Sequence, residues 1–195
     1  HFILLSALCV QKPRLEFQHA KLAFEKALME SGLIYSIIRP TAFFKSLSGQ
    51  VERVKAGKPF LIFGDGRLTA CKPISDRDLA KFILRCIHDD TSWNKILPIG
   101  GPGPAITPRD QGDYLFSQLR LKPNFKSMPL WVLKVIIACL TFAGRYHTSI
   151  ADKAELARIG YYYATESMLV FDIDAGRYDE HLTPSTGQDT LFDHY

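Results

Sequence analysis

The sequence lacks a glycine-rich phosphate-binding motif. No G-x-G-x-x-G follows an apolar segment, and the run Gly100-Gly101-Pro102-Gly103 has proline where a phosphate cradle needs a backbone N–H donor. The chain also does not begin with methionine, because His1 stands directly before an apolar segment. We therefore expect the phosphate-binding half of any nucleotide-binding domain to lie outside these 195 residues.

The chain has few cysteines and only a mild net charge. The four cysteines form no C-x-x-C pair and no cluster with histidine, so neither a zinc site nor a disulfide framework is indicated. We predict no metal site and reduced, mostly buried thiols. The net charge of +4 is mild and forms no basic stripe, so nucleic acid is not an expected partner.

No apolar run is long enough to cross a bilayer. The longest, Pro129–Gly144, is shorter than a spanning helix requires and is interrupted by Lys134. We predict a helix that lines the core or a pocket, and Trp131 and Phe142 near its ends keep a membrane-surface helix open as the alternative. Such a surface helix would imply peripheral membrane contact.

What the sequence does contain is a strand–helix–strand pattern at its start. Residues 2–6 form a short apolar run typical of a strand that is buried on both faces of a parallel sheet. Residues 17–29 have helical spacing of apolar side chains, with Gly32 just past the end. Residues 33–38 form a second apolar strand, halted at Pro40. This pattern predicts a parallel βαβ unit.

The fold class that follows is α/β, with the chain forming the C-terminal part of a Rossmann-type parallel sheet. We expect residues 1–45 to end the dinucleotide-binding domain, and residues 46–195 to complete the sheet and form a small α+β substrate-binding region. In that region the patterns predict a helix over 47–55, a hairpin of strands 60–63 and 67–72, a helix capped by Ser75, a strand over 96–100, a helix capped by Thr107, a helix over 150–159 ended by Gly160, and a strand over 168–171.

Chemistry is expected where the parallel strands end, because ligands of such sheets bind beyond the carboxyl ends of the strands. Ser6 follows the first strand, and the turn Arg39-Pro40-Thr41-Ala42-Phe43-Phe44 follows the second. The residues that we predict to contact a dinucleotide cofactor here are Ser6, Pro40, Thr41, Ala42 and Phe43. Plain packing of the two aromatic residues is the alternative.

The helix between these strands carries a variant of a catalytic motif. Phe17-Gln18-His19-Ala20-Lys21 matches the Y-x-x-x-K of short-chain dehydrogenases, with phenylalanine in place of tyrosine. The spacing puts both side chains on one helix face, so Lys21 can reach a cofactor ribose, whereas Phe17 has no proton to give. A lysine on an ordinary helix surface is the alternative.

Three other groups have simpler structural explanations. Ser75-Asp76-Arg77-Asp78 reads as a helix cap followed by acidic residues in the first turn. Tyr161–Tyr163 and Glu166 could supply a proton or line a pocket, although core and surface tyrosines are commoner. His19, His88 and His147 are isolated in sequence, and we expect them to be solvated.

Three longer segments carry a family resemblance. Residues 15–80 (LEFQHAKLAFEKALMESGLIYSIIRPTAFFKSLSGQVERVKAGKPFLIFGDGRLTACKPISDRDLA), 97–103 (LPIGGPG) and 161–172 (YYYATESMLVFD) resemble the plant-type divinyl chlorophyllide a 8-vinyl-reductases. These are atypical, NmrA-like short-chain dehydrogenases of plastids, and the chain is similar to their C-terminal part. The family also has phenylalanine at the position of Phe17.

The resemblance implies NADPH as cofactor, a divinyl chlorophyllide or protochlorophyllide as substrate, reduction of its 8-vinyl group to ethyl, and a plastid location. It implies that Lys21 positions the nicotinamide ribose. As candidate pigment contacts we name Phe44, Trp131 and Tyr162. Two alternatives remain open: a non-catalytic NADPH-binding regulator or assembly factor of the same fold, and an isolated interaction domain without cofactor.

Overall fold

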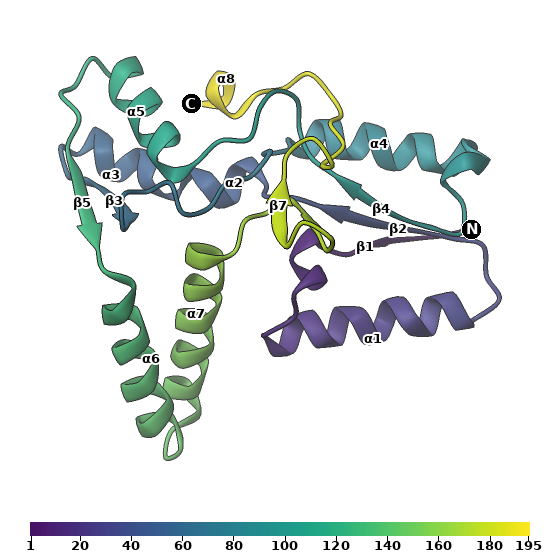
Figure 1. The fold of residues 1–195 in the computed structure, drawn as a ribbon, viewed down its shortest axis with the longest axis horizontal. Helices are drawn as coiled ribbons and strands as arrows, with labels where there is room; N and C mark the ends of the chain where they lie inside the picture. The colour runs from purple at the N-terminus through teal and green to yellow at the C-terminus, as the bar shows by residue number, and fades with distance from the viewer. The chain divides into compact units, whose positions relative to one another are not determined.

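The computed structural model describes residues 1–195, which divide into two compact units (Figure 1). Unit 1 comprises His1–Val51, Ala70–Ile106 and Met168–Tyr195, and unit 2 comprises Glu52–Thr69 and Thr107–Ser167. Each unit is therefore built from segments that are distant in sequence. The sequence-based division at residue 45 stays a prediction.

Unit 1 is built on a parallel sheet of three strands in the order β1 (Phe2–Leu5), β2 (Tyr35–Pro40) and β4 (Lys95–Ile99). Helix α1 (Glu16–Glu30) connects β1 to β2, and α4 (Asp76–His88) precedes β4. Figure 1 shows α1 and α4 on opposite sides of this sheet. The predicted α/β class and the parallel βαβ unit are confirmed.

Two expectations about these strands were wrong in detail. Phe2 and Leu5 of β1 are exposed, so this strand is not buried on both faces. The reason is that β1 is an edge strand with only β2 beside it. The second strand begins at Tyr35 and not at Leu33. Leu33 and Ile34 are exposed, and the Ile34 carbonyl accepts the Phe2 N–H at 2.8 Å where the ladder starts.

One hydrophobic core cluster of unit 1 lies between the sheet and α4. It contains Ile38, Ile74, Leu79, Cys86 and Ile99, all buried. Helix α4 starts as the sequence predicts, because the side chain of its N-cap Ser75 accepts a hydrogen bond from the Asp78 N–H at 3.0 Å. Its apolar side chains at positions 79, 82, 83 and 86 then face the sheet.

The remaining elements of unit 1 are short. The predicted helix over 47–55 is instead a succession of α2 (Phe44–Leu47), a 3-10 turn (Ser48–Gln50) and α3 (Val51–Lys55). The boundary between the units falls in α3, after Val51. The predicted strand over 168–171 begins two residues later and forms an antiparallel hairpin. Unit 1 also contains two 3-10 turns, a two-stranded hairpin and a short C-terminal helix: Leu8–Gln11, Asp90–Ser92, β6 (Val170–Asp172), β7 (Arg177–Asp179) and α8 (Leu191–His194).

Unit 2 contains a second, two-stranded parallel sheet. Strand β3 (Phe60–Phe63) pairs with β5 (Phe125–Met128), so the predicted hairpin of 60–63 with 67–72 is wrong. After β3 the chain turns at Gly64 and Gly66, both with positive φ, and leads away from the ladder. Cys71 then exchanges backbone hydrogen bonds of 3.0 and 2.8 Å with Ile106 inside unit 1. Helix α5 (Pro108–Gln118) also belongs to unit 2.

Two long helices complete unit 2. Helix α6 (Leu130–Gly144) has no buried residue, whereas α7 (Thr148–Thr165) buries Ala154, Tyr162 and Ala164. The predicted helix end at Gly160 is wrong: α7 continues, with open space around that glycine, through the three tyrosines. Neither helix, nor any other in the structure, is long and apolar enough to span a membrane.

The C-terminal segment is fastened to unit 1 by a buried carboxylate. Asp78 in the first turn of α4 accepts hydrogen bonds of 2.8 Å from the backbone N–H groups of Gln188 and Asp189. Gly187 reaches this position with φ +80°, and a Cβ atom there would collide with the Asp78 carboxylate. Close approach of the segment to α4 therefore requires glycine at position 187.

We expect Gly187→Ala to lower the free energy of unfolding by about 2 kcal/mol or more, because it adds a steric clash and weakens two hydrogen bonds to a buried carboxylate. Gly103→Ala is the matched control, since Gly103 has φ +81° but open space around it. It should cost only the left-handed backbone strain of about 1 kcal/mol. Urea unfolding measures both, and equal losses would contradict the role of Asp78.

Candidate functional site

The three strands of unit 1 end at one edge of the sheet, where a ligand is expected. Ser6 N–H donates to the Ile38 carbonyl at 2.8 Å, and Thr41 N–H donates to the Ile99 carbonyl at 2.9 Å. These bonds extend the ladder by one step on each strand. The sequence-predicted residues Ser6 and Thr41 are thereby placed on the same edge.

A buried carboxylate ties this edge to α1. Glu25 is 1% exposed and accepts hydrogen bonds from the Ser6 hydroxyl and from the Arg39 guanidinium, whose Nε lies 3.1 Å from Oε1. The three residues come from α1, from β2 and from the end of β1. Sequence reasoning missed Glu25 and Arg39 as partners, although a glutamate four residues after Lys21 on the same helix face was a usable signal.

Lys21 lies one turn before Glu25 on that face. Its Nζ is 3.5 Å from the carbonyl oxygen of Leu5, the last residue of β1. Phe17 stands a further turn back and is half-buried. The ammonium group therefore lies near the carboxyl end of β1, and its contact with a cofactor ribose stays a prediction.

The turn after β2 is fixed by internal hydrogen bonds. The Thr41 hydroxyl donates to the Lys72 carbonyl, and the Ala42 carbonyl accepts from Ile74 N–H at 2.9 Å. Phe43 forms a bridge with Ile74 and packs against the core, and Pro40 is buried. The side chains of Ser6 and Thr41 are thus engaged within the protein, so contact between these predicted residues and a cofactor stays a prediction.

Lys72 is a buried cation that sequence reasoning did not single out. Its Nζ donates to the carbonyl oxygens of Thr183 at 3.2 Å and Glu180 at 3.4 Å. These bonds attach the C-terminal segment to the loop that holds Thr41. The turn is therefore supported from both the sheet and the C-terminal segment.

A hollow of about 360 Å³ opens beside this edge. Leu5 and Phe43, which follow or end the strands, line it, and so do the charged residues Lys45 and Asp76. Its other lining residues are Ser46, Leu79, Ala80 and Ile83. The lining of the hollow is thus mostly apolar, with one cationic and one anionic side chain.

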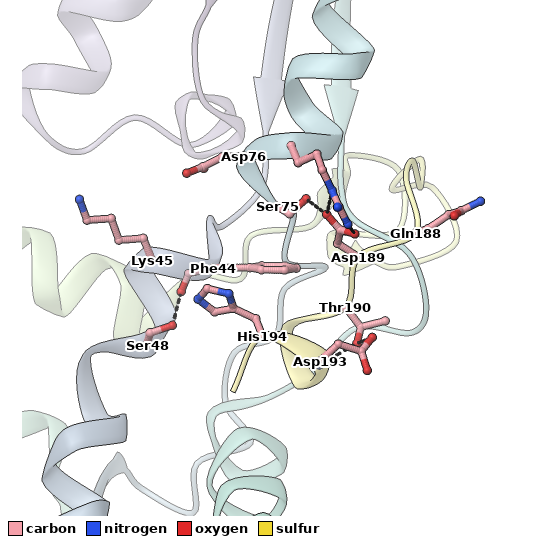
Figure 2. A pocket seen from close by; sticks show the side chains of 11 residues that line it. Phe44, Lys45, Ser48, Ser75, Asp76, Gln188, Asp189, Thr190, Asp193 and His194 are labelled. Atoms are coloured by element: carbon pink, nitrogen blue, oxygen red, sulfur yellow. Dashed lines mark hydrogen bonds and ion pairs between the residues drawn. The ribbon is translucent and has the colours of Figure 1, made fainter.

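A larger pocket of about 660 Å³ lies between α2, the start of α4 and the C-terminal segment (Figure 2). The ring of Phe44, a predicted pigment contact, faces that of His194, with 5.5 Å between centroids. Asp189 accepts hydrogen bonds from Arg77 and Ser75, which lower the pKa of its carboxyl to about 2. The Ser75–Asp78 segment therefore caps α4, as predicted, and also binds the C-terminal segment.

The other predicted pigment contacts belong to unit 2. Trp131 on α6 is exposed, whereas Tyr162 on α7 is buried. Their contact with a pigment stays a prediction. The structure contains no group of three or more His, Cys, Asp or Glu side chains placed to hold a metal ion. Of the four thiols, Cys139 is exposed and the other three are buried.

Sequence comparison connects this chain to one group of enzymes. No protein-family model matches it. It is 54% identical to the chloroplastic divinyl chlorophyllide a 8-vinyl-reductase of Cucumis sativus and 53% identical to that of Arabidopsis thaliana, in both cases over 100% of this chain and 48% of the relative. Over its whole length, the chain is a sequence relative of the divinyl chlorophyllide a 8-vinyl-reductases. It spans about half the length of these curated relatives.

Two solved structures share the fold of this chain. An NADPH-dependent quinone oxidoreductase of Escherichia coli, solved with NADPH, matches with a TM-score of 0.65 at 17% identity, over 99% of this chain and 64% of that one. Isoflavone reductase matches with a TM-score of 0.67 at 15% identity, over 98% and 64%. At this identity the likeness shows a shared fold.

We expect Glu25→Gln to lower the free energy of unfolding by about 3 kcal/mol, because it leaves the Arg39 charge without its buried partner. Glu30→Gln on the same helix is the control. Glu30 forms an exposed pair with Lys26 at 3.8 Å, and losing it should cost less than about 1 kcal/mol. Similar losses for both variants in urea unfolding would contradict the anchoring role of Glu25.

The low pKa of Asp189 makes its contribution to stability dependent on pH. Because its folded pKa of about 2 lies below the ordinary 3.8, the carboxylate stabilises the fold above about pH 4, and this is lost as the pH falls toward 2. The difference in unfolding free energy between the parent protein and Asp189→Asn should therefore shrink over that range. A difference that stays constant in urea titrations would refute it.

Proposed function

We propose that the protein carrying this chain is an NADPH-dependent reductase that converts the 8-vinyl group of a divinyl chlorophyllide or protochlorophyllide to ethyl in the chloroplast. The observation that carries the proposal is 52–55% identity over 98–100% of the chain to four proteins named as chloroplastic divinyl chlorophyllide a 8-vinyl-reductases. Because the chain spans about half of each relative, the activity and location belong to the whole protein.

The residues of unit 1 fit the nicotinamide and ribose end of NADPH. The Lys21 ammonium is held at the carboxyl end of β1, next to a turn that internal hydrogen bonds keep fixed. Hydroxyl groups of a ribose are suitable acceptors for an ammonium donor. The phosphates require a glycine-rich turn, which these 195 residues do not contain.

NADPH supplies a hydride when bound, and the chain's own residues would orient its ribose. Lys21 would donate hydrogen bonds to the ribose hydroxyls. Glu25 would act one turn away as a positioning residue, because its bonds to Ser6 and Arg39 fix α1 against the strand ends. Phe17 would present an apolar ring on the same helix face.

The absence of a tyrosine at position 17 suits a vinyl substrate. Carbonyl reduction develops negative charge on one oxygen, which needs an acid close by. A vinyl group conjugated with a macrocycle spreads that charge over many atoms, so a strong acid at the position of Phe17 is not required. A non-catalytic NADPH-binding relative would also tolerate this phenylalanine, and activity measurements separate the two functions.

In the full-length protein, we expect Lys21→Ala to lower kcat/KM for NADPH about ten- to a hundredfold, since a charged hydrogen bond contributes about 1.5–3 kcal/mol. Lys26→Ala is the matched control, because Lys26 is exposed on the same helix and pairs only with Glu30 in the structure. Its kinetics should be unchanged. Equal effects of both variants on divinyl chlorophyllide reduction would contradict the role of Lys21.

Phe17→Tyr tests whether the missing tyrosine is functional. We expect activity to stay the same or fall slightly, because the hydroxyl is added to a half-buried apolar ring and must lose part of its hydration. The assay follows conversion of divinyl to monovinyl chlorophyllide. A large gain in activity, or no activity in the parent protein together with tight NADPH binding, would favour the non-catalytic relative.

A further inference from the structure

Helix α6 presents an apolar surface that nothing in unit 2 covers. None of its residues is buried, and Trp131 and Phe142 are each 64% exposed. Trp131, Val135, Ala138 and Phe142 follow one another at steps of four, three and four residues, so they form one face of the helix. All four are exposed. We call these four residues the α6 stripe.

The α6 stripe lies on a helical hairpin. Helices α6 and α7 are joined by a short turn after Gly144, and a Cβ atom at Gly144 would come within 2.9 Å of the Ala151 backbone. Figure 1 shows the two helices side by side. One face of α6 is therefore held by α7, while the α6 stripe stays in contact with solvent.

The charges of α6 itself and of the segment before it have one sign. The neighbouring helix α7 carries Asp152 and Glu155, of which Glu155 is paired with Arg158 at 2.9 Å. Between Asp113 and Asp152 the sequence contains no aspartate or glutamate. Lys134 and Arg145 each stand three residues after an aromatic residue of the stripe, and so lie along its border. The Arg145 guanidinium is 5.9 Å from the Phe142 ring. The same acid-free stretch also carries Arg120, Lys122 and Lys126.

This charge pattern indicates which partner binds the α6 stripe. A second copy of the chain would bring cations against cations, which disfavours self-association. An anionic lipid surface offers a negative headgroup layer to the cations and an apolar layer to the α6 stripe. Trp131 and Phe142, near the two ends of the helix, are aromatic residues of the kind that anchor proteins at this boundary.

We propose that the α6 stripe, bordered by Lys134 and Arg145, binds the surface of an anionic lipid bilayer. The helix lies in the plane of the interface and does not cross it, since no helix is long and apolar enough to span. This inference is independent of the reductase activity. It requires only that the α6 stripe is accessible in the whole protein.

Vesicle flotation of the full-length protein tests the proposal. We expect flotation with vesicles of phosphatidylcholine mixed with phosphatidylglycerol, and at least about tenfold weaker partitioning into phosphatidylcholine alone. The double variant Trp131→Ala/Phe142→Ala should partition about tenfold less into the anionic vesicles. Ile173→Ala, at a site 86% exposed in unit 1, is the control and should bind like the parent protein.

The charge-reversal variant Lys134→Glu/Arg145→Glu should abolish the preference for anionic over neutral vesicles. If thermal melting shows that Trp131→Ala/Phe142→Ala is unfolded, the charge-reversal variant alone tests whether the α6 stripe binds anionic lipid. The proposal is overturned by absence of flotation with either vesicle, by equal partitioning into both, or by parent-like binding of the charge-reversal variant. A dimer that the double alanine variant dissociates in gel filtration would show that a second copy covers the stripe, and would overturn it too.

Discussion

The candidate site depends on one buried carboxylate, that of Glu25. Its bonds to Ser6 and Arg39 join α1 to the ends of two neighbouring strands, and Lys21 lies one helical turn away on the same face. A buried carboxylate is costly unless its charge and hydrogen bonds are satisfied, so α1 can neither rotate nor slide without breaking them. The position of the Lys21 ammonium at the end of β1 is therefore a consequence of the Glu25 network.

The sequence predicted the outer members of this arrangement and missed its centre. The sequence pattern placed Ser6 and Thr41 at strand ends and Lys21 on the connecting helix, because helical periodicity and parallel topology depend on local pattern, and their contact with a cofactor stays a prediction. Glu25 and Arg39 were not found, because their pairing joins residues from different elements and a charged side chain usually indicates a solvated surface. The buried Lys72 was missed for the same reason.

A similar limit explains which parts of the fold were predicted. The βαβ unit and α4 follow from local periodicity and capping, and both are confirmed. The pairing of β3 with β5 joins segments far apart in sequence, so a glycine turn after β3 was read as a hairpin. Gly160 was predicted to end a helix, but α7 continues through it. A glycine inside a helix costs about 1 kcal/mol, and burial of Tyr162 and Ala164 offsets this cost.

The two units use their charged residues in different ways, and this separates their roles in experiment. Unit 1 buries Glu25, Lys72 and Asp78 with partners, so substitutions there change stability and the geometry of the strand ends. In unit 2, Lys134 and Arg145 are exposed beside an apolar helix face. Because exposed side chains contribute little to folding, removing them should alter what the surface binds while leaving the fold intact. Stability and surface binding can thus be measured on different residues of one chain.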